Sequence, residues 1–297
     1  MNAFACVPAP FGLLLDVDGP IASPLTRTIA INSIVDDLLT LAAAGIPIAF
    51  ITGRSDAFMR EQVVARLVGT ALHHGGLDAD ALVFGVFEKG GCWAPVTPQG
   101  LGFLEIDEPV AVPPALREAI EGCARTHYAD TMFVDEAKHV MISLEARVDV
   151  SPADYQAAQR RYQDDVFELL QQRGLGVRYG DRVHLDSDGA VRWRIDPTII
   201  STDVESVLLD KDRGASRALD WFAAHGATAE RWYSVGDSRT DYLMADAVHA
   251  RGIPVAHVDV RPGDGMLKRP YDVMVEGDLV HDAAGAAFLR RRVAELR

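Results

Sequence analysis

The sequence has 297 residues, of which 48% are hydrophobic and 24% are charged. This composition is typical of a globular protein with enough apolar residues to build a core, and the length predicts two domains. The formal net charge of −14 excludes a general attraction to nucleic acid or to anionic lipid, so an anionic ligand would need a local cation.

The N-terminal segment and the cysteines favour a cytoplasmic location. No apolar stretch approaches the roughly 20 residues that cross a bilayer. The apolar N-terminal run is interrupted by Asp16 and has no Lys or Arg before Arg27, which is untypical of a signal peptide. The three cysteines, Cys6, Cys92 and Cys123, are widely spaced and form no zinc, redox or disulfide pattern.

The first hundred residues alternate apolar strands with helical patterns. Residues 11–17, 46–51 and 82–87 predict buried strands, and residues 28–44 have the apolar spacing of a helix. Residues 88–91 then predict a turn that reverses the chain. Continuous apolar strands that alternate with helices are typical of a parallel sheet covered on both faces.

The middle of the chain has a different pattern. Helices are expected at residues 113–125 and 151–173, the second with Ser151 as its N-cap and Pro152 at its first position. Alternating strands joined by hairpins indicate an antiparallel sheet with helices on one side. The expected strands are residues 131–134, 140–144, 175–179, 183–185 and 190–195.

From residue 205 the first pattern returns. Strands are expected at residues 206–209, 232–235, 253–258 and 271–275, and helices start near Lys211, at Tyr242 and at Val280. The predicted fold class is therefore α/β, with a doubly wound, Rossmann-like parallel sheet. Residues 1–100 and 200–297 would form this core, and residues 101–199 would form an inserted α+β cap domain.

Four of the predicted parallel strands end in polar residues, and ligands of such sheets bind at the carboxyl ends of the strands. Each segment alone has an ordinary explanation as a solvated turn or a helix cap. Together they favour a site, because they occur in order, each after its own predicted strand. In addition, Lys211 is one of only four lysines in the chain and lies where a phosphate site would need a cation. The four segments are Asp16–Gly19, Thr52–Arg54, Asp210–Lys211, and Gly236–Asp237 with Asp241.

A fifth segment, Asp186–Gly189, has the same D-x-D-G spacing. It lies in the middle region between two alternating strands, where Asp-Gly predicts a hairpin turn. It also lacks the glutamate that completes an EF-hand loop. We interpret this segment as structural.

Together, the four strand ends resemble the motifs of the haloacid dehalogenase superfamily of phosphohydrolases. The matching stretches are DVDG, ITGR, the lysine of LLDKDRGASRAL, and GDSRTD. The stretch FGVFEKGG resembles the turn before the cap in the Cof-type, sucrose-phosphatase and phosphomannomutase branch. Two positions depart from the family pattern, Pro20 in place of threonine and Thr240 in place of asparagine, and neither removes a carboxylate.

The resemblance implies a phosphatase mechanism with an aspartyl-phosphate intermediate. Asp16 would be the nucleophile, because a carboxylate can divide the slow hydrolysis of a phosphate ester into two easier steps. Asp18 would protonate the leaving group and later accept a proton from the attacking water. The resemblance also implies a Mg²⁺ cofactor held by Asp16, Asp237 and the carbonyl of Asp18, with Asp241 orienting a ligand.

The remaining candidates would bind phosphate or substrate. Thr52 and Lys211 would contact the phosphoryl group. Gly53, Arg54 and Lys89 are further candidates at the same edge, although a structural ion pair is an equal explanation for Arg54. The resemblance implies a small phosphorylated metabolite as substrate, such as a sugar phosphate.

Two other functions are compatible with these motifs. A phosphosugar mutase of the same branch would return the phosphoryl group to its substrate. A catalytically silent binding protein would not need the catalytic residues. The intact motif positions therefore argue against it; they are Asp16, Asp18, Thr52, Lys211 and Asp237. An ordinary dinucleotide-binding domain is excluded, because no G-x-G-x-x-G follows the first strand.

Overall fold

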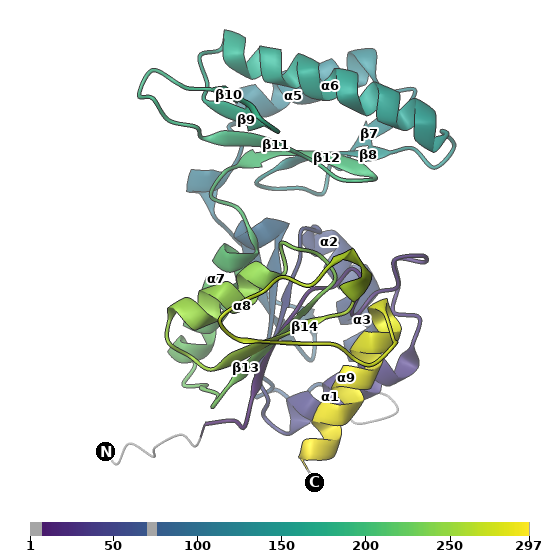
Figure 1. Cartoon of the computed structure of the whole chain (residues 1–297), viewed down its shortest axis with the longest axis vertical. Helices are drawn as coiled ribbons and strands as arrows, with labels where there is room; N and C mark the ends of the chain where they lie inside the picture. Colours follow the sequence, from purple (N-terminus) through teal and green to yellow (C-terminus); the bar gives the residue numbers. More distant parts are fainter. Residues whose placement is uncertain (1–7, 70–75, 297) are drawn as a thin grey trace. The chain divides into compact units, whose positions relative to one another are not determined.

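The computed structural model describes residues 8–69 and 76–296, which divide into two compact units (Figure 1). The first unit comprises the described residues of Met1–Glu105 and Asp210–Arg297, and the second is Ile106–Leu209. Within the described ranges, none of the helices has both the length and the apolar composition of a membrane span.

The first unit is built on a nine-stranded sheet with the order β15-β14-β13-β1-β2-β3-β4-β5, and β6 pairs with β4. The strands from β15 to β3 are parallel, and β4 runs antiparallel to β3. The predicted α/β class with a mainly parallel sheet is thus confirmed. The strands are β1 Gly12–Leu15, β2 Ile48–Ile51, β3 Val83–Phe87, β4 Cys92–Thr97, β5 Gly100–Leu101, β6 Glu105–Ile106, β13 Trp232–Gly236, β14 Val255–Asp259 and β15 Asp272–Met274.

Helices cover both faces of this sheet. Trp232 packs against Phe222 of α7, whereas the next residue, Tyr233, packs against Phe288 of α9. Successive residues of a strand point to opposite faces, so α7 and α9 lie on different sides of the sheet, as Figure 1 shows. The helices of this unit are α1 Asn32–Ala43, α2 Asp56–Met59, η1 Arg60–Val64, α3 Ala65–Gly69, α7 Lys211–Ala224, α8 Tyr242–Ala250 and α9 His281–Glu295, with short turns η2 Glu88–Gly90 and η4 Pro262–Asp264.

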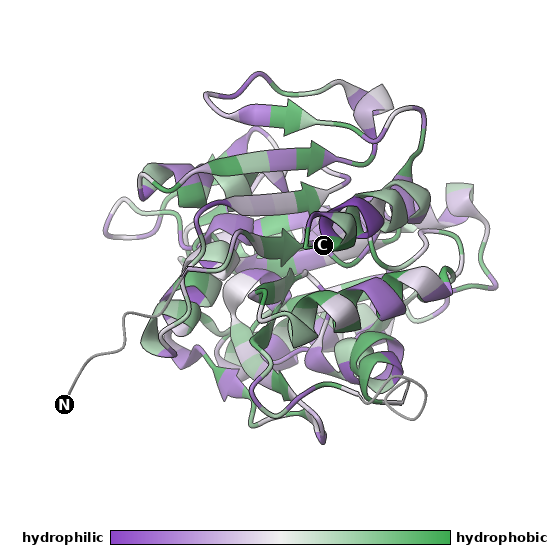
Figure 2. Ribbon diagram, turned by 90° about the horizontal axis from the view of Figure 1, so that it is seen from below, coloured by the Kyte–Doolittle hydropathy of each residue, from purple (hydrophilic) through white to green (hydrophobic). Residues whose placement is uncertain are grey.

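The sequence forms these elements for simple reasons. Every residue of β1, β2 and β3 is buried, which requires the uninterrupted apolar runs that the sequence has there. The helices instead have one buried side, and Figure 2 shows hydrophobic and hydrophilic residues alternating along them. Helix α1 packs beside α9, and α7 packs beside α8.

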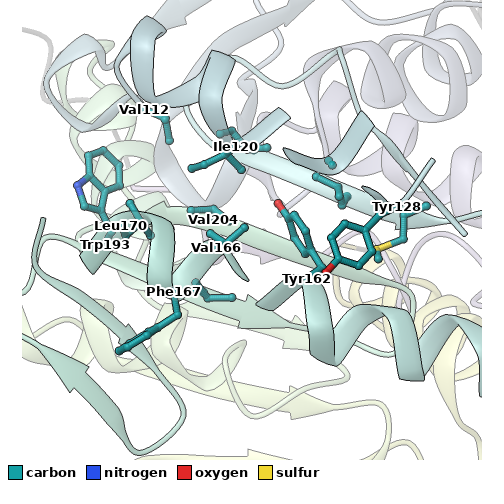
Figure 3. Close-up of a cluster of buried hydrophobic side chains, with 14 of the residues drawn as sticks. Val112, Ile120, Tyr128, Tyr162, Val166, Phe167, Leu170, Trp193 and Val204 are labelled. Carbon is teal, nitrogen blue, oxygen red and sulfur yellow. The ribbon is translucent and has the colours of Figure 1, made fainter. Parts of the chain in front are cut away.

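The second unit is a six-stranded sheet, ordered β10-β9-β11-β12-β8-β7, with α5 and α6 on one face. Its neighbouring strands are antiparallel except β9 and β11. Apolar side chains of both helices and of the sheet form one core cluster, part of which Figure 3 shows. The elements are η3 Glu108–Val110, α5 Pro114–His127, β7 Met132–Val134, β8 Ile142–Ala146, α6 Pro152–Gln172, β9 Val177–Tyr179, β10 Arg182–His184, β11 Trp193–Pro197 and β12 Ser201–Ser206.

The helix α6 starts as the sequence predicts. The Ser151 side chain accepts a hydrogen bond from the backbone N–H of Asp154, and Pro152 is the first helical residue. The predicted strand at 206–209 is wrong, because Val207 and Leu208 lie in a turn. The strand here is β12, hydrogen-bonded between β11 and β8 of the second sheet. Val204 is the single apolar residue of this strand, and its polar composition concealed it.

The predicted hairpin at Asp186–Gly189 is also wrong. This turn connects β10 to β11, but these strands lie on either side of β9 and do not pair with each other. The carboxylates of Asp186 and Asp188 stabilise this turn. Asp186 Oδ1 accepts hydrogen bonds from the N–H groups of Asp188 and Ala190, and both Asp186 and Asp188 form ion pairs with Arg192.

A buried histidine in the first unit predicts a pH dependence of stability. His257 Nδ1 lies 2.7 Å from the Ser234 hydroxyl, and both residues are fully buried. Burial lowers the pKa of His257 to about 4. The unfolded chain therefore binds a proton at a higher pH than the folded chain does, so folding stability falls as the pH falls from about 6.5 towards 4.

We expect this histidine to contribute a loss of about 2 kcal/mol in the free energy of unfolding between pH 7 and pH 5. Urea denaturation of the wild type and of His257→Gln at both pH values measures it. The variant removes the titrating group, so its stability should depend less on pH. Equal pH dependence in both proteins would contradict the assignment.

Candidate active site

The carboxyl ends of β1, β2 and β13 meet at one edge of the sheet. Strand β1 lies between the other two, with Leu15 in register with Val235 of β13 and with Phe50 of β2. The residues that follow these strands are Asp16, Thr52 and Asp237. The N–H of Asp16 still donates to Val235 O at 2.9 Å, so the first carboxylate is fixed directly beside β13.

Three carboxylates converge at this edge. Asp16, Asp237 and Asp241 each offer one oxygen, and the three oxygens lie within 4.8 Å of one another. Asp16 and Asp241 are buried, and the side chain of Asp237 is 17% exposed. Three negative charges this close are unfavourable unless cations compensate them.

Lys211 supplies one of these cations. Its Nζ lies 2.6 Å from Asp16 Oδ1, 2.7 Å from Asp241 Oδ1 and 3.0 Å from the carbonyl oxygen of Ile51. These contacts employ the three donors of an ammonium group. Burial alone would lower the pKa of Lys211, but the carboxylates of Asp16 and Asp241 outweigh it, so the pKa is raised and the side chain stays charged.

One lysine does not balance three carboxylates. Burial, followed by the charge of Asp241, raises the pKa of Asp16 well above its usual range. The same two causes raise the pKa of Asp237 to about 6, although Arg261, His281 and Lys211 act in the opposite direction. The site thus has an excess of buried negative charge and several oxygen ligands. These residues fit a hard divalent cation such as Mg²⁺, which prefers carboxylate ligands.

Two glycines allow the carboxylates to approach. Gly19 has φ of +97°, and a Cβ there would lie 2.7 Å from Asp237 Cγ. A Cβ on Gly236 would lie 2.2 Å from Asp241 Cβ. Asp241 also shapes the loop, because its Oδ2 accepts hydrogen bonds from the N–H groups of Asp237 and Ser238 at 3.0 and 2.9 Å. This explains the four-residue spacing of the two aspartates.

Asp18 and Arg54 form a bidentate pair beside this cluster. Nε and Nη2 of Arg54 donate to the two carboxylate oxygens of Asp18, both at 3.0 Å. The Asp18 side chain is 37% exposed, so it is accessible from solvent. The structure therefore places the two candidate residues in contact, and Arg54 forms an ion pair with Asp18.

Thr52, Gly53 and Lys89 lie side by side at the end of β2. Thr52 is fully buried, and its Oγ1 accepts a hydrogen bond from the Arg54 N–H at 3.1 Å. The N–H of Lys89 donates to Thr52 O at 3.0 Å, and a Cβ on Gly53 would lie 3.7 Å from Lys89 Cε. Lys89 and the preceding Glu88 have positive φ values of 54° and 49°. This strained turn places the side chain of Lys89 alongside Gly53.

The sequence analysis missed His281. Its Nδ1 lies 3.6 Å from Asp237 Oδ2, at the first residue of α9. No local motif marks this histidine, because its position depends on how α9 packs against the sheet. A cavity of about 410 Å³ also adjoins Asp237, with Arg239, Tyr242 and Arg261 in its lining.

No protein-family model matches the sequence, and a search of curated proteins found no match. Solved structures do share its fold. The C-terminal domain of trehalose-6-phosphate phosphatase from C. albicans superposes with a TM-score of 0.63 and 12% identity, over 97% of this chain and 93% of that one.

Two further structures are similar. A haloacid dehalogenase-like hydrolase from Bacteroides thetaiotaomicron has a TM-score of 0.56 and 11% identity over 96% of this chain and 99% of that one. IMP-nucleotidase from Plasmodium falciparum has a TM-score of 0.52 and 9% identity, over 96% of this chain and 61% of that one. At these identities the likeness shows that the chains share a fold.

The contacts of Lys211 predict a large effect of its removal. Lys211→Met would leave Asp16 and Asp241 buried without their cation, so we expect a loss of about 3 kcal/mol in the free energy of unfolding at pH 7.5 in EDTA. At pH 5 the loss should be smaller, because a protonated carboxylate relieves the repulsion.

Urea denaturation at both pH values, always relative to the wild type at the same pH, measures this loss. The matched control is Lys268→Met, since Lys268 is exposed and removing its charge should change stability by less than about 0.5 kcal/mol. A Lys211 variant as stable as this control would show that the ion pairs contribute nothing.

Proposed function

We propose that the protein is a Mg²⁺-dependent phosphatase of the haloacid dehalogenase superfamily that hydrolyses a phosphate monoester through an aspartyl-phosphate on Asp16. The observation that carries this proposal is the buried Asp16 carboxylate, next to Lys211 and within 4.8 Å of carboxylates that can hold a cation. A carboxylate in such surroundings is suited to attack an anionic phosphoryl group, because positive charges offset the repulsion.

In the first step, an Asp16 oxygen would attack phosphorus, and the bond from phosphorus to the ester oxygen would break. Lys211 binds Oδ1 of Asp16, so its charge would also reach the phosphoryl oxygens. Asp18 would give its proton to the leaving alkoxide. In the second step, water would attack the phosphorus and pass a proton to Asp18, and the bond to Asp16 would break, releasing inorganic phosphate.

The cation would be held by the side chains of Asp16 and Asp237 and by the main-chain carbonyl of Asp18. When bound, Mg²⁺ supplies charge neutralisation for the phosphoryl oxygens. Asp241 would orient this site through the loop N–H groups that it binds. The hydroxyl of Thr52 would donate to a phosphate oxygen from the neighbouring strand end.

Arg54 would have two partners in this mechanism. Its planar guanidinium now binds Asp18 with two parallel hydrogen bonds, and the same fork matches a phosphate group. Both oxygens of Asp18 accept hydrogen bonds in this pair, so Asp18 would have to leave it to carry a proton, and Arg54 would then bind the phosphate group instead. Gly53 and Lys89 would line the same side of the phosphate site.

A small phosphorylated metabolite, such as a sugar phosphate, is the proposed substrate class. The similar structures include a trehalose-6-phosphate phosphatase and an IMP-nucleotidase, whose names refer to substrates of this size. The second unit would act as the cap that excludes water and contacts the leaving group. Membership of the Cof-type branch and a cytoplasmic location stay predictions.

Asp16→Asn tests the nucleophile. We expect turnover of p-nitrophenyl phosphate to fall by at least about a thousandfold, because an amide cannot replace the attacking carboxylate. Circular dichroism should show an unchanged fold. The matched control is Asp188→Asn, in the other D-x-D-G segment, which should keep turnover near that of the wild type. Comparable turnover in both variants would refute the assignment.

Removal of divalent cations tests the metal. EDTA should stop phosphate release, and added Mg²⁺ should restore it, because the carboxylate cluster would otherwise repel the substrate. Colorimetric phosphate release over a panel of phosphorylated metabolites would then identify the substrate class. Activity that is indifferent to EDTA would remove the cation from the mechanism, and a strict need for a bisphosphate activator would indicate a mutase.

A further inference from the structure

His281 has a backbone conformation that is costly for a residue with a side chain. Its φ is +52°, in the left-handed region, where only glycine lacks the penalty of a Cβ. Two of the other non-glycine residues with positive φ, Glu88 and Lys89, also lie at the candidate site. Glycine would fit the His281 backbone without this penalty, so the imidazole needs an explanation.

The surrounding structure holds this residue firmly. The N–H of His281 donates to Val260 O at 2.7 Å, and the N–H of Val260 donates to Gly236 O at 2.9 Å. The start of α9 is therefore joined to the residue just before Asp237. One turn further along α9, a Cβ on Gly285 would lie only 1.9 Å from Pro20 O, so the helix also packs directly on the loop that follows Asp18.

The imidazole lies against the carboxylate of Asp237. Its Nδ1 is shielded from solvent, forms no hydrogen bond among the described residues, and lies 3.6 Å from Asp237 Oδ2. A Cβ on Gly19 would lie 2.8 Å from the same Oδ2. Oδ2 of Asp237 therefore has both the backbone of Gly19 and the ring of His281 as close neighbours.

We propose that His281 is a positioning residue for Asp237: its Nδ1–H donates to Oδ2 and fixes the carboxylate, leaving the other oxygen for the divalent cation. The inference rests on the proposed function, since it concerns the same cation. Among the described residues, the group of possible ligand atoms within 4.8 Å of one another comprises Asp16, Asp237 and Asp241 and no nitrogen of His281, so we assign His281 no contact with the cation.

The physical reason is preorganisation. A carboxylate that already has a fixed orientation loses less freedom when it binds a cation, and partners of this kind typically change metal affinity by about 10–100-fold. The strained backbone is then the cost of placing a ring nitrogen where glycine would place nothing. A histidine that only begins the helix would have no such effect on the cation.

Three variants separate these roles. His281→Gly removes the ring and the backbone strain together, so the apo protein should melt no lower than the wild type, while its dissociation constant for Mg²⁺ rises about tenfold. His281→Asn tolerates a left-handed backbone and keeps an N–H donor, so its affinity should stay within about threefold of the wild type. His281→Ala should lose affinity as the glycine variant does and melt below it.

Isothermal titration calorimetry of the full chain with MgCl₂, together with melting temperatures in EDTA, measures both properties without using activity. Weaker Mg²⁺ binding in the glycine variant at an undiminished melting temperature, with recovery in the asparagine variant, supports the proposal. Wild-type affinity in the glycine variant overturns it and leaves the phosphatase assignment intact. A wild type that binds no Mg²⁺ overturns both proposals, because the metal-dependent mechanism would then fail as well.

Discussion

The buried ion pairs of Lys211 are the interactions on which the site depends. A single ammonium group lies between Asp16 and Asp241 and also binds the carbonyl end of β2, so it joins three strand ends that are far apart in the sequence. Buried charges of this kind are stable only when they are paired with good geometry. The remaining negative charge defines where a second cation would be favourable.

Close backbone approach is the second constraint. Gly19 lies against the Asp237 carboxylate, and Gly236 lies against Asp241, at distances that no side chain would permit. Helix α9 can likewise approach the Pro20 carbonyl oxygen closely, because Gly285 has no Cβ. Proline at position 20 is compatible with this contact, since the contacting atom is its backbone oxygen. The site is therefore formed by loops that touch each other directly.

Backbone strain is concentrated at the edges of this site. Of the four described non-glycine residues with positive φ, three are Glu88, Lys89 and His281. Glu88 and Lys89 follow β3 and are held by hydrogen bonds to Arg54 O and Thr52 O, and His281 is held by Val260 O. Such conformations persist where the surrounding structure enforces them, and they tend to mark functional positions.

The sequence determined the fold class and pointed to most residues of the candidate site. Fully buried parallel strands need continuous apolar runs, and polar residues directly after such runs must lie at one edge of the sheet, so Asp16, Thr52 and Asp237 could be identified from local pattern. Lys211 was identified as well, but the strand expected before it is absent, and the residue instead begins α7 after its N-cap Asp210. The polar strand β12 was missed and the turn at Asp186–Gly189 was assigned wrongly, because strand pairing depends on partners that local alternation does not reveal.

Only the tertiary structure decided which side chains touch. The pairing of Arg54 with Asp18 joins residues 36 positions apart, and the contact of His281 with Asp237 depends on the packing of α9. Neither residue pair has a sequence signature, since each is set by the helices and loops that carry it and not by its own neighbours. Local chemistry thus fixed which groups the strand ends carry, whereas long-range packing fixed their partners.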